Sequence, residues 1–236
     1  MKIKLLLPIV LFVNFCFSQN HFELKEASNT YDVKINVQTC ENNECGGKAI
    51  IELIDKKTST KIQTLTSDDL SFYLNEEQKP TANIIQVYNK QSPIIFNDFN
   101  FDGTEDLALR NGTESGYGGP SYDVYVYNMT KKQFVLSDEL TILAHENLGM
   151  FNTDSERKRL ITYSKSGCCW HVTQEYTVVP ERGPLKVYEF EEDTRDPKTV
   201  ITKRTEFADY KWVTKTTKYP REVYYKETKD ENTEGN

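Results

Sequence analysis

The residues most suited to chemistry lie in one short loop, residues 98–106, with the sequence DFNFDGTED. Oxygen-bearing side chains occupy loop positions one, three, five and nine, and a glycine occupies position six. Ca²⁺ takes about six to eight oxygen ligands, which alternate residues of a tightly coiled loop can direct inward. The spacing predicts a calcium loop whose ligands are the side chains of Asp98, Asn100, Asp102 and Asp106 and the carbonyl of Thr104.

This loop differs from an EF-hand. Its twelfth position is Leu109, where an EF-hand places a bidentate glutamate, and strand-like sequences flank it on both sides. The alternative is an ordinary turn that binds nothing, because Asp, Asn and Gly favour turns in their own right. Three carboxylates without a cation would repel one another, which favours the calcium interpretation. No nucleophile and base accompany the loop, so we expect a structural ion.

A second candidate segment, residues 116–122, follows with the sequence GYGGPSY. Three glycines and a proline indicate a shaped, exposed loop, and tyrosines supply large amphipathic contact area. We expect Tyr117, Ser121 and Tyr122 to contact a protein partner. The alternative is a plain turn whose tyrosines pack back on a sheet.

A third segment, residues 164–171 with the sequence SKSGCCWH, places a cation, an indole and an imidazole beside two adjacent cysteines. His171 has the chemistry of a base or a metal ligand. However, none of the three histidines of the chain stands in metal-ligand spacing with another. We therefore expect His171 to be a structural or partner-contacting residue.

The N-terminus has the pattern of a secretory signal peptide. Lys2 and Lys4 precede an apolar run at residues 5–17, and the chain turns polar at residues 18–20. We expect residues 1–19 to be removed and the protein to be periplasmic or otherwise exported. The apolar run is too short to span a bilayer, and no later segment is comparably apolar.

Charge and composition exclude several classes of function. The chain has 236 residues and a net charge of -7, and loss of the two N-terminal lysines would make it -9. Because the basic residues are scattered and form no stripe, nucleic acid is not an expected partner. The G-x-S-x-G, H-E-x-x-H and Cys-His-Asn signatures are missing from the sequence, so we expect no enzyme activity.

Loss of the signal would also remove Cys16 and leave four cysteines in an oxidising compartment, where disulfides persist. Cys40 and Cys45 flank a turn-rich segment and are the favoured pair. Cys168 and Cys169 would then form a vicinal disulfide or remain thiols. Crossed pairings between the two sets stay open, whereas a zinc site is disfavoured because two C-x-x-C motifs are lacking.

The rest of the sequence predicts a single all-β domain at residues 20–225. We expect a small, propeller-like succession of antiparallel strands at residues 31–37, 49–54, 62–65, 84–88, 94–96, 106–109, 122–127, 133–136, 160–163, 172–179, 185–190, 200–207 and 210–217. Only residues 137–148 look helical, with Ser137 as the N-cap and Gly149 as the stop. Residues 226–236 are charged and polar, as in a disordered tail.

Taken together, the calcium loop, the 116–122 loop and the segment 166–171 resemble the calcium-binding periplasmic lysozyme inhibitors of β-propeller fold. The resemblance covers roughly residues 94–176. It implies that the calcium loop supports the fold and that surface loops block the cleft of a peptidoglycan-cleaving lysozyme, the implied partner. The alternative is a calcium-stabilised envelope module that binds carbohydrate or another envelope protein.

Overall fold

The computed structural model describes residues 20–86 and 91–226, and these form an all-β protein with 58% strand. Fourteen strands make three antiparallel sheets, accompanied by the eight-residue helix α1 (Asp138–His145). The expected all-β succession of antiparallel strands is confirmed. The predicted signal segment and the tail beyond Lys226 lie outside the described residues.

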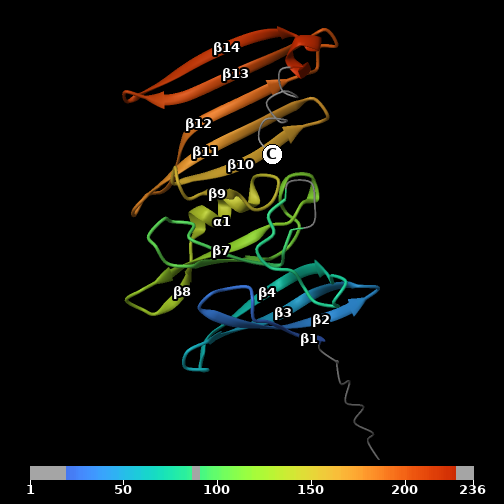
Figure 1. Cartoon of the computed structure of the whole chain (residues 1–236), viewed down its shortest axis with the longest axis vertical. Coiled ribbons are helices and arrows are strands. Elements are labelled where there is room, and N and C mark those ends of the chain that lie inside the picture. The colour runs from blue at the N-terminus through green and yellow to red at the C-terminus, as the bar shows by residue number, and fades with distance from the viewer. Residues whose placement is uncertain (1–19, 87–90, 227–236) are drawn as a thin grey trace, which may run out of the picture.

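Each sheet consists of strands that are consecutive in sequence, as in a propeller blade. The N-terminal sheet contains β1 (Asn20–Leu24), β2 (Tyr31–Glu41), β3 (Glu44–Asp55) and β4 (Lys61–Tyr73). The central sheet contains β5 (Ile94–Asn97), β6 (Asp106–Arg110), β7 (Tyr122–Asn128) and β8 (Gln133–Leu136). The C-terminal sheet contains β9 (Asn152–Asp154), β10 (Arg159–Ser166), β11 (Trp170–Val179), β12 (Gly183–Asp193), β13 (Thr199–Ala208) and β14 (Lys211–Pro220). The three sheets follow one another along the long axis of the molecule (Figure 1).

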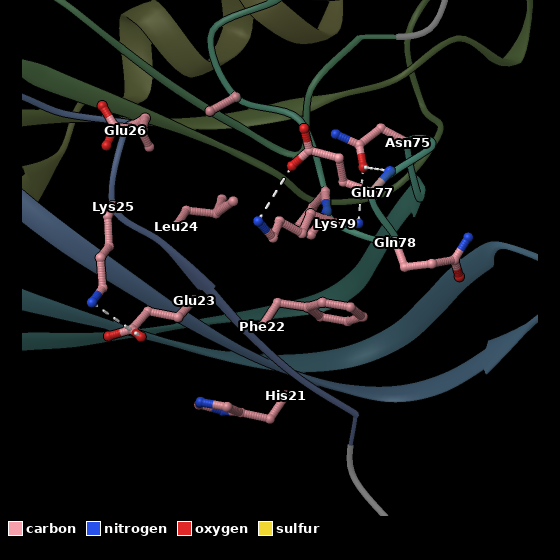
Figure 2. A pocket seen from close by; sticks show the side chains of 13 residues that line it. His21, Phe22, Glu23, Leu24, Lys25, Glu26, Asn75, Glu77, Gln78 and Lys79 are labelled. Carbon is pink, nitrogen blue, oxygen red and sulfur yellow. Dashed lines mark hydrogen bonds and ion pairs between the residues drawn. The ribbon is translucent and has the colours of Figure 1, made fainter.

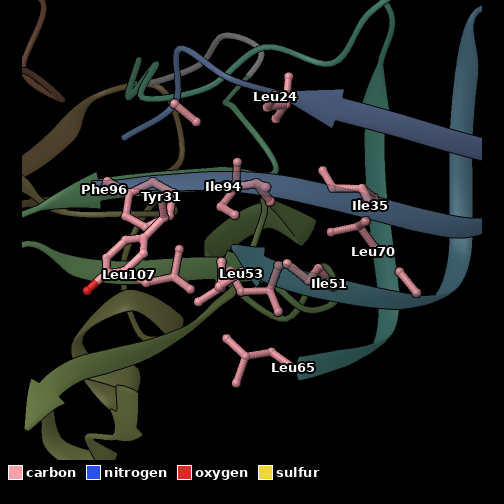
Figure 3. Packing of buried hydrophobic residues seen from close by; sticks show 14 of the residues in the cluster. Leu24, Tyr31, Ile35, Ile51, Leu53, Leu65, Leu70, Ile94, Phe96 and Leu107 are labelled. Atoms are coloured by element: carbon pink, nitrogen blue, oxygen red, sulfur yellow. The ribbon is translucent and has the colours of Figure 1, made fainter. Parts of the chain in front are cut away.

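The central sheet lies between two hydrophobic cores because its side chains alternate between its two faces. Leu107 and Leu109 of β6 pack with the N-terminal sheet, in the core that Figure 3 shows, whereas Ala108 packs on the opposite side. On that side, Tyr122 and Val124 of β7 join α1 and the first strands of the C-terminal sheet. Both faces of the central sheet are therefore covered, and its exposed parts are mainly the loops that connect its strands.

Helix α1 starts where the sequence predicts it but ends at His145, three residues before the predicted end. The Ser137 hydroxyl accepts a hydrogen bond from the Leu140 N–H at its N-terminus, and Leu140, Leu143 and Ala144 are buried. Gly149 follows the helix with a φ of 88°, a conformation that favours glycine. The buried residues Leu140, Leu143 and Ala144 form the apolar face that packs the helix on the central sheet.

One predicted strand is wrong, and two strands were not predicted. Residues 84–86, the described part of the expected strand 84–88, have no strand structure. There the Ile84 N–H donates to the Ser92 hydroxyl, so a side chain takes the place of a ladder partner. The unpredicted strands are β1, whose sequence NHFEL has little apolar alternation, and the three-residue β9.

The C-terminal sheet extends beyond the core. Its first strands cover α1 and the central sheet, but every residue of β14 except two is exposed. Figure 1 shows β13 and β14 at the end of the molecule farthest from the N-terminal sheet. Among the described residues, no helix is long and apolar enough to cross a membrane.

Candidate functional site

The predicted calcium loop connects β5 to β6 in the central sheet. Its last residue, Asp106, begins β6 and is fully buried. One carboxylate oxygen, Oδ2, accepts hydrogen bonds from the N–H groups of Phe99 and Asn100 at 2.9 and 3.3 Å. Burial raises the pKa of Asp106 to about 7, although these backbone donors act in the opposite direction.

The side chains of Asp98, Asn100 and Asp102 hydrogen-bond within the loop itself. Asp98 accepts from the N–H groups of Asp102 and Gly103 at 3.0 and 2.8 Å. Asp102 accepts from the Thr104 N–H at 2.8 Å and from the Asn100 side-chain amide at 2.8 Å. Despite partial burial, the hydrogen bonds from Thr104 and Asn100 lower the pKa of Asp102. The loop is thus closed by its own carboxylates.

The predicted ligands of the loop have the right chemistry for a hard cation, but their side chains do not point towards a common centre in this structure. Within residues 20–86 and 91–226, no group of three or more His, Cys, Asp and Glu side chains comes together to hold a metal ion. Asp98, Asn100, Asp102 and Asp106 nevertheless offer only oxygen ligands, which Ca²⁺ prefers. Binding would require the carboxylates of half-buried Asp98 and exposed Asp102 to turn from loop N–H groups towards the ion.

The second candidate segment forms a short 3-10 turn, η1 (Gly116–Gly118), that presents one tyrosine. Tyr117 is 65% exposed and has a φ of 61°. A hydrogen bond of 2.8 Å from the Gly116 N–H to the Asn147 carbonyl fixes this turn on the segment that follows α1. A Cβ on Gly116 would lie 3.3 Å from that same oxygen, so the close approach favours glycine here.

Two predicted partner contacts are wrong. Ser121 and Tyr122 are both 0% exposed and cannot reach a partner in this structure. The Ser121 hydroxyl donates to the Asn111 carbonyl at 2.7 Å, and the Tyr122 hydroxyl donates to the Ser92 carbonyl at 2.8 Å. Because Tyr122 starts β7 on the inward face, alternation buries it, and its burial raises the pKa of the phenol.

The structure joins two candidate segments that lie fifty residues apart. The Tyr117 hydroxyl oxygen accepts a hydrogen bond of 2.6 Å from the Gly167 N–H, in the turn between β10 and β11. The Lys165 ammonium lies 4.7 Å from the centre of the Tyr117 ring, within cation–π range. Tyr117, Lys165 and Leu148 line a hollow of about 240 Å³ with the neighbouring loop. We call the exposed surface made by η1, Lys165 and Gly167 the paired-loop surface.

His171 extends the paired-loop surface. It stands directly opposite Lys165 in the pairing of β10 with β11, so the two side chains share a face of the sheet. Its Nδ1 lies 3.8 Å from a carboxylate oxygen of Glu192, the residue opposite it on β12. Sequence reasoning did not select Lys165, although its position within the segment 164–171 is the signal that points to it.

The favoured disulfide between Cys40 and Cys45 is present, and of the alternatives left open for Cys168 and Cys169 the structure has the vicinal disulfide. Cys40 and Cys45 face each other across the β2–β3 hairpin, with their Cα atoms 4.0 Å apart. Cys168 and Cys169 form a vicinal disulfide in the turn that contains Gly167. The crossed pairings and the free-thiol alternative are therefore wrong. The carbonyl of Cys169 accepts from the Thr194 N–H at 2.7 Å, which ties this turn to the end of β12.

A separate hollow of about 820 Å³ lies between β1 and residues 75–82 (Figure 2). Four of its charged side chains form two ion pairs: Lys25 lies 3.8 Å from Glu23, and Lys79 lies 3.3 Å from Glu77. None of the predicted site residues lines it.

Comparison with protein-family models finds no match, and comparison with curated proteins finds none either. Among solved structures, the chain is similar to one described as a Xanthomonas type IV secretion system related protein. The two share 23% identity with a TM-score of 0.64, over 84% of this chain and 98% of that chain. At this identity the likeness establishes a shared fold.

Proposed function

We propose that this chain is an exported binding protein that inhibits a peptidoglycan-cleaving lysozyme through its paired-loop surface. The observation that carries the proposal is the hydrogen bond between Tyr117 and Gly167, which unites the two loop segments of the family resemblance. Two disulfides support export, because such bonds persist in oxidising compartments. The name of the structural neighbour also supports an envelope role.

The chemistry of the surface suits a cleft that contains carboxylates. Lysozyme-like enzymes use a pair of carboxylic side chains on either side of the scissile bond. Lys165 would supply a positive charge to such a site and Tyr117 a large ring with a polar end. The net charge of -7 would also attract a cationic enzyme at low salt. Inhibition of this kind requires no catalytic group in the inhibitor.

Calcium is part of the same proposal. Asp98, Asn100, Asp102 and Asp106 would hold the ion with the Thr104 carbonyl, and the ion would neutralise the carboxylates of the loop. The loop contacts β7 through Asp106, and β7 begins five residues after Tyr117. A bound ion would therefore stiffen the sheet that carries the paired-loop surface.

A turbidity assay of peptidoglycan lysis tests the function. Purified protein is added to lysozymes of several structural types, with and without Ca²⁺, and the rate of clearing is measured. Inhibition of one type by a stoichiometric complex supports the proposal. If no lysozyme type is inhibited or bound at micromolar concentration, the proposal is wrong.

The second candidate is a calcium-stabilised envelope module that binds carbohydrate or another envelope protein. The name of the structural neighbour, which relates that protein to a type IV secretion system, supports an envelope role for this candidate. The two candidates differ in their ligand. Binding of peptidoglycan fragments in the absence of lysozyme, measured by calorimetry, would favour the module over the inhibitor.

A further inference from the structure

The hairpin of β13 and β14 ends in an exposed aromatic tip at the far end of the C-terminal sheet. Its two-residue turn consists of Asp209 and Tyr210, with φ values of 51° and 60°. This is the turn geometry that suits the twist of a tight hairpin. Tyr210 is 97% exposed, so its ring has almost no contact with the protein.

Further large apolar side chains are exposed near this end of the hairpin. Phe207 and Trp212 face each other across the hairpin with ring centroids 5.4 Å apart, and they are 46% and 45% exposed. Leu185 of β12 adds a 43% exposed side chain at the same end of the sheet. Val213 is 49% exposed and lies on the opposite face of the hairpin, because it follows Trp212 directly in β14. Concentrated apolar exposure of this kind marks an interaction site more often than scattered single residues do.

The hairpin is basic although the protein is acidic. Residues 199–220 contain five basic and two acidic side chains, whereas the whole chain has a net charge of -7. At the tip, Lys211 follows the turn, and the two acidic residues are Glu206 of β13 and Asp209 of the turn. Lys186 of β12 places its ammonium 6.0 Å from the centre of the Trp212 ring and 2.6 Å from a carboxylate oxygen of Glu189. The excess of basic side chains is therefore in β14, which carries Lys211, Lys215 and Lys218 and no acidic residue, beside the exposed ring of Trp212.

We propose that this hairpin tip docks on a membrane surface that contains anionic lipid. Trp and Tyr rings partition to the level of the lipid headgroups, because they combine an apolar body with a polar group. Lysines beside them are attracted to anionic headgroups. The mixture of exposed rings and cations therefore fits a headgroup layer, with Tyr210 as the residue that enters first.

A second copy of the chain fits the hairpin less well. The free edge of the sheet is β14, which carries Lys211, Lys215 and Lys218 and no acidic residue. Pairing two such edges would bring like charges together, and lysines on an edge strand oppose edge-to-edge association. Charge complementarity favours an anionic surface instead.

The proposed membrane contact leaves the paired-loop surface free. Strand pairing aligns Trp170 with Asp193, Asp193 with Ile201 and Ile201 with Lys218. The turn that contains Gly167 is therefore at one end of the C-terminal sheet, and the hairpin tip is at the other. The membrane proposal does not depend on the identity of the protein partner.

Vesicle flotation tests the proposal with neutral phosphatidylcholine vesicles and with vesicles that also contain phosphatidylglycerol. We expect binding to the anionic vesicles only, with release at high salt. Lys211→Glu is expected to lower the bound fraction at least about fivefold. Replacing Tyr210 and Trp212 by serine together is expected to lower it about tenfold. Because wild type and variants share the same N-terminal residues, differences between them report on the hairpin.

Fluorescence provides a second readout. The chain has two tryptophans, so Trp170→Phe leaves Trp212 as the single reporter. Its emission is expected to shift to shorter wavelength on anionic vesicles. The matched control is Val223→Ser, an exposed apolar residue after the opposite end of β14, which is 43% exposed and should leave binding unchanged.

Three outcomes would overturn the proposal. The first is that wild-type protein binds neutral vesicles as well as it binds anionic vesicles. The second is that Val223→Ser loses as much binding as the Tyr210 and Trp212 variant. The third is that the protein binds no vesicles and instead forms a dimer, which the Tyr210 and Trp212 substitutions dissociate. The last outcome would assign the tip to a second copy of the chain. Thermal melting of each variant verifies that it is folded.

Discussion

The Oδ1 oxygen of Asp106 accepts a hydrogen bond of 2.9 Å from the backbone N–H of Tyr127, at the far end of β7. The other carboxylate oxygen closes the 98–106 loop by accepting from Phe99. One buried carboxylate thus connects the candidate calcium loop to the strand that follows the paired-loop surface. A change in the loop, such as the binding of an ion, is therefore expected to change the stability of the central sheet.

Calcium is expected to raise the melting temperature of the protein by roughly 5 to 10 °C when it is present at about a hundred times its Kd. The reason is that an ion bound only to the folded state stabilises that state by mass action. Asp98→Ala and Asp102→Ala are expected to abolish the response to Ca²⁺ and to chelator, as measured by differential scanning calorimetry.

Asp55→Ala is the matched control for calcium. The Asp55 carboxylate also accepts N–H bonds in a turn, from Lys57 and Thr58, but that turn lacks the calcium spacing. The variant is expected to keep its calcium response. A chelator response that is missing in the wild-type protein would contradict the calcium assignment.

Tyr117→Ala is expected to weaken binding to the lysozyme partner by about 2 kcal/mol, or about thirtyfold in Kd, because a few aromatic residues tend to dominate an interface. Tyr117→Phe removes only the hydroxyl that accepts from Gly167, so it separates the role of the ring from that of the loop contact. Surface plasmon resonance measures both. Tyr210→Ala, which alters another exposed tyrosine, is the control; an equal loss there would count against the paired-loop surface.

Tyr122→Phe is expected to lower the free energy of unfolding by about 1 kcal/mol without changing partner binding. The substitution removes the hydroxyl that donates to the buried Ser92 carbonyl and keeps the ring in the core. Urea denaturation measures the stability and the binding assay measures the partner. A large loss of binding with unchanged stability would show that Tyr122 is accessible after all.

The two disulfides are expected to contribute different amounts to the free energy of unfolding. Replacing Cys40 and Cys45 by alanine removes a crosslink between residues five apart and is expected to cost about 2 kcal/mol of stability. Replacing Cys168 and Cys169 by serine removes a crosslink that encloses no intervening residue, and about 1 kcal/mol is expected. Denaturation of both variants under non-reducing conditions measures the two losses of stability. A larger loss for the Cys168 and Cys169 variant than for the Cys40 and Cys45 variant would contradict the prediction.

Local patterns in the sequence were sufficient for much of the fold. Apolar alternation located most strands, Ser137 marked the start of α1, and the turn between Cys40 and Cys45 predicted their pairing. Each of these features depends on neighbouring residues. The end of the helix was predicted three residues too late, at residue 148 rather than at His145. The short strand β9 carries too few residues for such a pattern.

The candidate site was predicted less completely because it depends on contacts between distant segments. Composition alone could not distinguish exposed Tyr117 from buried Tyr122, since both belong to the same glycine-rich segment. Their difference arises from the start of β7 at Tyr122, which fixes the inward face. Likewise, no local signal in either segment predicts that Tyr117 meets Gly167 across fifty residues.

The position of the central sheet between two cores also determines how the molecule opens. Neighbouring residues of β6 belong to different cores, Leu107 to one and Ala108 to the other, so separation of either outer layer exposes this strand. Its amide hydrogens are expected to exchange with solvent only in rare, nearly global opening events, and those of the exposed β14 through local fraying. The protein thus combines a slowly exchanging centre with a terminal hairpin that can move while the centre stays closed.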